Sequence, residues 1–506
     1  MMKLTLKYQH LFWAILCGLT VVFASCSNED VAQNTNGVDN GSKLTTFSAN
    51  GPMSRTSMEN NGTFYWEAGD KIWVKDDTGT WQVSSNTPTS KTASFQFKVP
   101  GQFTKKSKYM VFYPGKSGNQ NQVTISTDQE QTVPNNSTHF GPSGDCGTAE
   151  AVGTIGGSNF SFRLNHQATY IIFQPYTTNS LIQNCYLTKI EVSSNNDISG
   201  TYTLDLTNGT LTGNGSKKQI TLTTKGSGNN GFLLTNSASD NISFMVVKPG
   251  THTFKVRYYI KGKDKNTNIE GTITKTYVSQ NLDKNKYYKI SDNVTPREYK
   301  TGNYYMWDAQ NHYWYGHETS QPTANNQQGQ NYPEYGDPLN RYFNNGGGSN
   351  PYEATTDLFK TLPNANEMSW YCMKGNPHWD ENELWMTMGH LHKGVMWFLK
   401  KDHIPNFSKE KGYDDKDYRT VASECNNNKI NKEPLSADDA NKYFPLPLAG
   451  FYYSGTLNYM DEIGFYWSSS AYPQGGGNAY RLYFSKTNIN VKTGSRINGA
   501  KAQKFH

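Results

Sequence analysis

The residues with the clearest chemical potential form an acidic run between two tryptophans. Asp380, Glu381 and Glu383 lie within the segment Trp379–Trp385. A pair of carboxylates on either side of a sugar bond is the catalytic apparatus of most glycosidases, and carboxylates also bind hard cations. The same run could be a solvated loop. We expect a loop or a cation site here rather than a glycosidase pair.

The histidines do not have the spacing of a metal site. His390 and His392 are two residues apart, which is wrong for one face of a helix, although a strand would place both on one side. His166 has no nearby partner at ligand spacing, so we expect a structural histidine. No catalytic triad, phosphate-binding loop or dinucleotide fingerprint is visible. The sequence therefore predicts no metal, no cofactor and no enzyme.

The N-terminus has the pattern of an exported, lipid-anchored protein. Lys3 and Lys7 precede the apolar run Leu11–Phe23, which is too short to span a bilayer stably. The run ends in Phe23-Ala24-Ser25-Cys26, which resembles the lipobox of bacterial lipoproteins. We predict a signal peptide over residues 1–25, a lipidated (palmitate-bearing) Cys26, and a flexible tether over residues 26–43.

Two acids follow the predicted lipidation site. The segment Ser27-Asn28-Glu29-Asp30 resembles the tag that directs some Gram-negative lipoproteins to the outer surface. The resemblance implies a protein held by a lipid anchor in the outer membrane and exposed at the cell surface.

The other cysteines of the mature chain suit disulfides, because exported proteins fold in oxidising compartments. We expect Cys372 to pair with Cys425, and Cys146 with Cys185. Four cysteines allow three connectivities, so the sequence alone leaves the pairing open.

Composition excludes further classes of protein. The chain has 506 residues, of which 18% are charged and 13% aromatic. It is long enough for three or four domains and too aromatic to be disordered. Lys and Arg number 48 against 42 Asp and Glu, which leaves a formal charge of +6. This excess is too weak to indicate nucleic-acid binding.

Residues 44–293 have the pattern of an all-β region. Short β-branched and aromatic runs are separated by Gly, Asn, Asp and Pro, and apolar and polar residues alternate in Phe254–Tyr258. We predict two tandem β-sandwiches, residues 44–155 and 156–293, with a boundary in the Gly-rich sequence near 145–160. Trp66 and Trp73 lie in strand-like runs and are expected in the core.

Three ordered motifs in this region resemble the fimbrillin family, the type V pilus subunits. The first is Phe64-Tyr65-Trp66-Glu67-Ala68-Gly69-Asp70-Lys71-Ile72-Trp73-Val74, preceded by Arg55-Thr56; the second is Phe162–Ala168 and the third is Leu282–Ile290. The resemblance implies that a protease removes an N-terminal strand after a basic residue, and that another subunit fills the groove with a strand of its own. Arg55 is the first candidate for this processing and Lys43 the second; the alternative is that Arg55 is an ordinary exposed turn residue.

Residues 294–506 are predicted to form an α+β domain. Helices are expected over residues 364–374 and 437–443, where Ser436 and Asp439 suit a capping box. Strands are expected over residues 465–469, 480–485 and 489–491.

The same region resembles the FISUMP family, whose fold is related to that of C-type lectins. The resemblance lies in Tyr443–Gly450, in Gly464–Ser470 with its Tyr-Trp-Ser-Ser-Ser block, and in Ala479–Phe484. Gln503 stands where that family usually has Arg. The sugar-and-calcium motifs of C-type lectins are missing. The resemblance implies a C-type-lectin-like head domain that works by contact.

Aromatic residues in loops are the candidates for ligand contact, because aromatic rings stack on sugars or fill pockets and loops often carry binding residues. Trp370, Trp397 and Trp467 are expected in the core instead. The candidates are Trp307, Tyr313, Trp314, Tyr315, Tyr332, Tyr335 and Tyr472.

Together these features predict a fimbrial subunit at the cell surface, acting as a tip adhesin. The chain ends within the head at Lys504-Phe505-His506, so it is expected to have no free donor strand and to block growth beyond it. Its partners would be other fimbrial subunits and a glycan or protein ligand on another surface. The alternative is a stand-alone glycan-binding surface lipoprotein. A third possibility is an enzyme acting on surface glycans or sulfated substrates.

Overall fold

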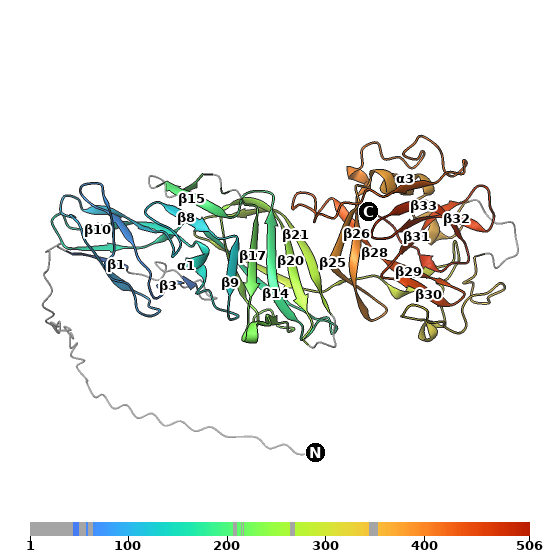
Figure 1. Cartoon of the computed structure of the whole chain (residues 1–506), viewed down its shortest axis with the longest axis horizontal. Helices are drawn as coiled ribbons and strands as arrows, with labels where there is room; N and C mark the ends of the chain where they lie inside the picture. The colour runs from blue at the N-terminus through green and yellow to red at the C-terminus, as the bar shows by residue number, and fades with distance from the viewer. Residues whose placement is uncertain are drawn as a thin grey trace, which may run out of the picture. The chain divides into compact units, whose positions relative to one another are not determined.

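The computed structural model describes residues 44–49, 57–58, 64–205, 210–213, 215, 217–263, 269–343 and 353–505. This part of the chain is mostly β, as predicted (Figure 1). Among these residues, no helix has the length and apolarity that crossing a bilayer requires. The helices are α1 (Phe140–Ser143), α2 (Asp357–Lys360) and α3 (Ala365–Lys374), with 3₁₀ turns η1 (Ser227–Asn229), η2 (Thr301–Asn303), η3 (Glu318–Ser320) and η4 (Lys401–His403).

The first sandwich is built on one sheet with the strand order β5-β4-β7-β10-β11-β1-β6, in which β12 also pairs with β10. Side chains from these strands and from the preceding loops share one aromatic core, with Trp66, Phe97 and Phe160 buried in it. The strands are β1 (Thr45–Ala49), β4 (Trp73–Lys75), β5 (Trp81–Val83), β6 (Phe95–Val99), β7 (Lys108–Tyr113), β10 (Gly147–Gly153), β11 (Asn159–Phe162) and β12 (Asn165–His166), with the separate pair β2 (Ser57–Met58) and β3 (Phe64–Tyr65).

The second sandwich encloses a larger core that contains Phe173, Ile190 and Val256. One layer has the order β19-β13-β22 and the other contains β21-β20-β14-β17-β9; a small sheet, β16-β15-β8, adjoins them. The strands are β8 (Gln122–Ile125), β9 (Asp128–Gln131), β13 (Thr169–Tyr176), β14 (Tyr186–Ser194), β15 (Gly200–Asp205), β16 (Thr210–Thr212), β17 (Gln219–Thr224), β18 (Phe232–Leu233), β19 (Ser243–Val247), β20 (Gly250–Lys261), β21 (Glu270–Leu282) and β22 (Tyr287–Asn293).

The predicted boundary at residues 155/156 cuts through the first sheet. β11 follows that position but pairs with β1 and β10, whereas β9 precedes it but pairs with β17 of the second sandwich. The chain therefore crosses between the two sandwiches more than once. Gly-rich sequence at 153–157 forms a hairpin turn within the first sheet rather than a linker between domains.

The C-terminal region is α+β, as expected. Its main sheet has the order β24-β34-β31-β32-β33-β27, and α3 packs against β27, β33, β32 and β31. A second group of strands, β28-β26-β25, continues the large sheet of the second sandwich beyond β21. The strands are β23 (Arg297–Glu298), β24 (Tyr304–Tyr305), β25 (His378–Thr387), β26 (His390–Leu399), β27 (Cys425–Asn427), β28 (Tyr443–Pro447), β29 (Ala449–Tyr453), β30 (Thr456–Met460), β31 (Gly464–Ala471), β32 (Asn478–Phe484), β33 (Ile489–Ser495) and β34 (Ala500–Lys501).

One of the two predicted helices forms. At the start of α3, the Asn364 side chain accepts a hydrogen bond from the Glu367 N–H at 2.9 Å, and Glu367 Oε2 accepts one from the Asn364 N–H at 2.8 Å. This capping box satisfies N–H groups that the helix itself cannot. The predicted helix over 437–443 is wrong. Ser436 and Asp439 do hydrogen-bond as a cap would, but the segment is a turn, because Tyr443 already begins β28.

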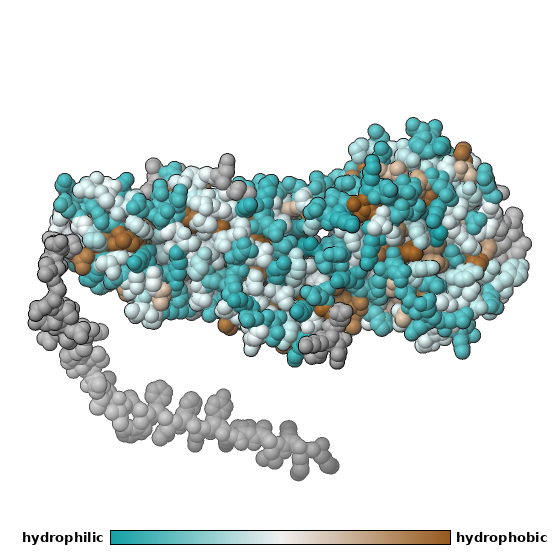
Figure 2. Space-filling view, viewed as in Figure 1, coloured by the Kyte–Doolittle hydropathy of each residue, from teal (hydrophilic) through white to brown (hydrophobic). Residues whose placement is uncertain are grey.

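The surface on the face shown in Figure 2 is mostly hydrophilic, with apolar side chains in small, separate patches. Such scattered exposure is ordinary for a soluble surface and needs no partner to explain it. On this face, contacts with other molecules are therefore better sought in grooves and cavities than on an apolar patch.

Candidate functional site

The strand β1 is inserted between two neighbours in the first sheet. It runs parallel to β11, with Phe47 opposite Phe160, and antiparallel to β6, with Phe47 opposite Phe97. Among the described residues β6 ends the sheet path, so β1 is its only ladder partner in that sheet. Removal of β1 would leave unpaired backbone groups along both β6 and β11.

The side chains of β1 fill the core as well as the ladder. Phe47 and Ala49 are fully buried. The Phe47 ring stacks on Phe160 at 5.4 Å and meets Phe103 edge-on at 5.1 Å between ring centroids. Such aromatic pairs add to the free energy of burial. The site that β1 occupies is thus a groove with hydrogen-bonding edges and an apolar floor, which is the form of site that a β-strand can enter.

The predicted processing and lipidation residues lie outside the described residues: Cys26, Lys43 and Arg55. Their order in the chain still separates the two candidate cuts. β1 begins at Thr45 and ends at Ala49, so a cut after Lys43 would leave β1 attached to the rest of the chain. Only a cut after Arg55 would detach it.

The fimbrillin-like turn motif forms a specific turn. Gly69 adopts a φ of +85°, which favours glycine. Asp70 is buried, its Oδ2 accepts a hydrogen bond from the Glu67 N–H at 2.7 Å, and its Oδ1 accepts one from the Tyr113 hydroxyl at 3.0 Å. The motif therefore fixes a turn and ties it to β7. Trp66 is fully buried, as expected, and Trp73 packs on the core of the second sandwich.

His166 has the structural role that we expected. Its Nδ1 lies 2.9 Å from Asp145 Oδ1, and the Tyr170 hydroxyl donates a hydrogen bond to the same oxygen at 2.5 Å. All three side chains are buried. Asp145 is 21 residues away in sequence, which is why the motif alone did not reveal it.

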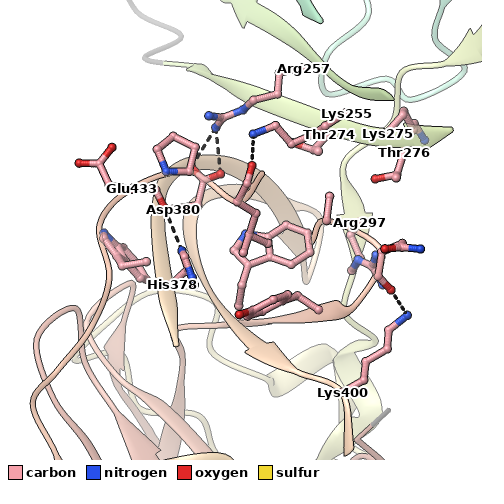
Figure 3. Close-up of a pocket in the computed structure, with 17 residues that line it drawn as sticks. Lys255, Arg257, Thr274, Lys275, Thr276, Arg297, His378, Asp380, Lys400 and Glu433 are labelled. Carbon is pink, nitrogen blue, oxygen red and sulfur yellow. Dashed lines mark hydrogen bonds and ion pairs between the residues drawn. The ribbon is translucent and has the colours of Figure 1, made fainter. Parts of the chain in front are cut away.

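The acidic run joins the C-terminal region to the second sandwich. Asp380 accepts hydrogen bonds from Arg257 Nη2 at 2.9 Å to each oxygen, and both side chains are largely buried (Figure 3). Lys255 also reaches across, and its Nζ donates to the Leu435 carbonyl (Figure 3). Loss of either partner of a shielded ion pair leaves the other charge buried without compensation, which is strongly destabilising.

Glu383 makes a second set of contacts across the junction. Its Oε1 accepts the Thr274 N–H at 3.0 Å and its Oε2 accepts the Thr274 hydroxyl at 2.7 Å. Burial, together with the charge on Asp380, raises the pKa of Glu383 to about 7. The ladder between β25 and β26 shifts register between Asp380 and Leu384, and this bulge directs both carboxylates at β20 and β21.

The solvated loop or cation site that we expected is therefore wrong for Asp380 and Glu383, while Glu381 is exposed. Both carboxylates bind protein groups of the second sandwich. In the described part of the chain, no three His, Cys, Asp or Glu side chains gather as metal ligands would. His392 instead stacks on Trp385, with 4.4 Å between ring centroids, and its Nδ1 lies 3.0 Å from Asp461.

Three of the aromatic residues that we predicted to contact a ligand are buried in the core instead. Trp307, Tyr313 and Trp314 are at most 1% exposed. Trp307 Nε1 donates to the Ser468 carbonyl at 2.8 Å, and Tyr313 stacks on Tyr452. The prediction failed because the loop that carries them packs on β31 and β29, so these side chains are core and not surface.

The other four candidates keep some exposure. Tyr335 is 71% exposed and Tyr315 is 44% exposed, whereas Tyr332 and Tyr472 are half-buried. Tyr472 packs edge-on against Tyr480, and Tyr335 against Tyr342. None of them lines either cavity at the junction between this region and the second sandwich, so their role in binding stays a prediction. Trp370 and Trp467 are core residues, as expected, and Trp397 is half-buried.

The four cysteines are buried free thiols in this structure. Cys372 of α3 and Cys425 of β27 lie side by side: the hydrogen bond between the two thiols, with burial, raises the pKa of Cys372. Cys146 adjoins Asp145, while Cys185 Sγ contacts the Leu181 carbonyl at 4.0 Å. The structure thus brings together the first predicted pair and shows no contact between the second.

Two adjoining cavities lie at the same junction. The larger, of about 320 Å³, is lined by strands β20, β21, β25 and β26 and by residues 433–443; the smaller is about 240 Å³. Both are lined by Thr274, Lys275, Arg297 and Trp397. We did not predict this site from the sequence. The only available sign was Lys255 and Arg257, cations that alternate with core residues along β20.

Comparison with solved structures finds adhesion and fimbrial proteins at low similarity. A candidate cell adhesion protein from Bacteroides ovatus is 16% identical, covering 49% of this chain and 93% of its own, with a TM-score of 0.33. A fimbrial protein from Bacteroides ovatus is 13% identical over 92% of this chain and 98% of its own, with a TM-score of 0.27. The tip fimbrial protein Mfa3 from Porphyromonas gingivalis, with C-terminal truncation, is 11% identical over 50% and 96%, with a TM-score of 0.26.

Likeness at these TM-scores carries no argument about this chain. No protein-family model and no curated protein matches the sequence. The resemblance of the C-terminal region to the FISUMP family and to C-type lectins therefore stays a prediction.

Proposed function

We propose that this protein is a fimbrial subunit of the cell surface whose β1 is exchanged for a strand of another subunit. The observation that carries the proposal is the position of β1. It is the first strand of the described residues, yet it is paired on both sides, and four of its five side chains are buried. The fimbrillin-like motifs, which form the Gly69-Asp70 turn and strand β22, agree with it.

Exchange of β1 is physically feasible because its contacts are of a general kind. Backbone hydrogen bonds do not depend on side-chain identity, and the floor of the groove needs only small or aromatic residues at alternate positions. A neighbouring subunit could supply such a strand. We propose Arg55 as the processing site, since a cut there detaches β1.

We further propose that the chain occupies the fimbrial tip as an adhesin, with Cys26 as the lipid anchor in the outer membrane before processing. β34 is paired with β24 and β31, and Phe505 packs against Tyr371 and Phe444. This segment is part of the C-terminal domain and is not available as a donor strand. The proposed role is binding and not catalysis, and Asp380 and Glu383 serve as structural groups.

Strand exchange can be tested with the purified full chain and a trypsin-like protease. After cleavage, a fluorescent peptide of residues 43–55 is added and its incorporation is followed by size-exclusion chromatography. The proposal predicts incorporation into the cleaved chain, and none into uncleaved Arg55→Ala protein. A peptide with Phe47→Asp is the matched control and should not bind, because its charge would enter the apolar floor. Failure of the cleaved chain to take up the unmodified peptide would contradict the proposal.

A further inference from the structure

The two junction cavities have an excess of positive charge. Five cationic side chains line them against three carboxylates: Lys255, Arg257, Lys275, Arg297 and Lys400 against Asp380, Glu383 and Glu433. Burial raises the pKa of Glu383 to about 7, so this carboxylate is only partly charged at neutral pH, and burial lowers the pKa of Lys255 from its ordinary value. The cavities are therefore suited to an anion.

The five cationic side chains differ in whether another protein group already pairs with them. Arg257 is paired with Asp380, while Lys255 and Lys400 donate to the backbone carbonyls of Leu435 and Asn441 (Figure 3). Lys275 and Arg297 make no hydrogen bond or ion pair with a side chain among the described residues. These two cations belong to the wall that both cavities share, so their charge is available to a ligand in either.

Aromatic rings line the same space. Trp397 is half-buried on the shared wall, and Trp379 and Tyr443 line the larger cavity. Gly394 has a φ of +98°, and a Cβ there would lie 2.6 Å from the Trp379 ring. Glycine at this position thus lets the Trp379 ring lie across β26. Thr276, His378 and Asn441 add further polar groups.

The combination indicates the class of ligand. A flat indole face packs on the apolar face of a sugar ring, and guanidinium or ammonium groups bind carboxylate or sulfate. Sites for small ligands usually have volumes of roughly 300–1,000 Å³. The larger cavity, of about 320 Å³, lies at the lower end of this range and suits one sugar residue, and the adjoining cavity of about 240 Å³ adds room beside it. An acidic peptide would use the cations but leave the ring faces without a matching partner.

We propose that this junction pocket binds an acidic sugar residue, with its carboxylate or sulfate held by Lys275 and Arg297 and its ring against Trp397. This inference rests on the proposed adhesin function and names the ligand class for it. The proposed binding site is therefore the junction between the C-terminal region and the second sandwich, and not the loop aromatics of the C-terminal region.

Titration calorimetry of the full chain tests the pocket with five probes: a glucuronic-acid disaccharide, a galactose-6-sulfate disaccharide, lactose, inorganic sulfate and a Glu-rich peptide. We expect at least one acidic sugar to bind about tenfold more tightly than lactose and sulfate, because it uses both the charge and the ring. Lys275→Gln and Arg297→Gln should each weaken that binding about tenfold. Both side chains can be replaced without loss of a described contact. Lys218→Gln, at an exposed position outside both cavities, is the matched control and should change nothing.

Several results would overturn the inference. One is equal affinity for lactose and the acidic sugars, and another is no response of acidic-sugar binding to Lys275→Gln and Arg297→Gln. Sulfate alone, or a Glu-rich peptide, binding as tightly as the sugars would reject the sugar class. No binding of either acidic sugar would also overturn it. In that case a positive peptide-exchange assay would leave the proposed fimbrial function intact, so the two failures can be told apart.

Discussion

The groove of β1 and the junction at β25 are two ways of joining a strand to a sheet. β1 pairs with both neighbours along most of its length, through backbone hydrogen bonds and apolar side chains. β25 meets β21 at a single ladder pair, Thr272 with Glu383, and is held by Arg257–Asp380 and by Glu383 with Thr274. The contact of β1 depends on features that many β-strands offer, whereas the contact of β25 depends on particular side chains.

Contacts made by the backbone can be made equally well by another strand, whereas contacts made by particular side chains cannot. Backbone pairing is offered equally by any strand of suitable alternation, so a strand from another chain can replace β1. A buried ion pair tolerates no partner that lacks the opposite charge. If β1 is exchanged as we propose, the second sandwich and the C-terminal region should stay joined to each other during the exchange.

The largest effect should come from the groove. Phe47→Ala removes the ring that stacks on Phe160 and should lower the free energy of unfolding of the first sandwich by about 3–5 kcal/mol. Ser48→Ala, on the less buried face of the same strand, should change it by less than about 0.5 kcal/mol. Urea denaturation followed by tryptophan fluorescence measures both. Equal effects of the two substitutions would show that β1 does not contribute through the apolar floor.

The junction should be nearly as sensitive to loss of one charge. Arg257→Met leaves the Asp380 carboxylate buried without its partner, and should cost about 3 kcal/mol. The double variant Arg257→Met with Asp380→Leu should recover much of this loss, because no charge is then buried alone. A double-mutant cycle by urea denaturation gives the coupling energy. Additive losses would mean that the two groups do not interact.

A disulfide between Cys372 and Cys425 should raise the free energy of unfolding of the C-terminal region. We expect these thiols to oxidise to a disulfide during export, with the electrons passing to a thiol–disulfide oxidoreductase, and to stabilise the domain by about 2–4 kcal/mol. Alkylation of the denatured, unreduced protein followed by mass spectrometry should then label Cys146 and Cys185 but not Cys372 or Cys425. Labelling of all four would rule the disulfide out.

The smallest effect concerns pH, and it should be confined to the C-terminal region. Burial lowers the pKa of Lys501, a residue of β34, to about 7 from the ordinary 10.5. Above pH 7 the unfolded chain keeps a proton that the folded chain has lost, so stability should rise from pH 7 to 9, by at most about 1.4 kcal/mol per pH unit. Lys501→Met should flatten this rise.

Lys504→Met is the matched control, because Lys504 is exposed three residues away. Thermal unfolding of the domain at pH 7, 8 and 9 measures the slope for each variant. An unchanged slope in Lys501→Met would mean that another group causes the pH dependence.

Local patterns in the sequence predicted much of the fold. Alternation predicted the mostly β class, and the segment that follows Pro363 predicted α3; the Asn364–Glu367 capping box that begins this helix was not predicted, although it needs only neighbouring residues. The partners of Asp380 and the burial of Trp307 could not be predicted, because both depend on residues more than a hundred positions away. The pairing of β9 with β17 and of β11 with β1 could not be predicted for the same reason. Ser436 with Asp439 shows the converse: a local cap formed, but strand pairing of Tyr443 ended the helix.

We propose that β1 is detached when the protein enters a fimbrium. N-terminal sequencing and mass spectrometry of the protein extracted from assembled filaments measure this directly. We expect a mature N-terminus at Thr56, immediately after Arg55. Filament-associated protein that still begins at a lipidated Cys26, or at Leu44 after a cut at Lys43, would retain β1 and show that β1 is not detached.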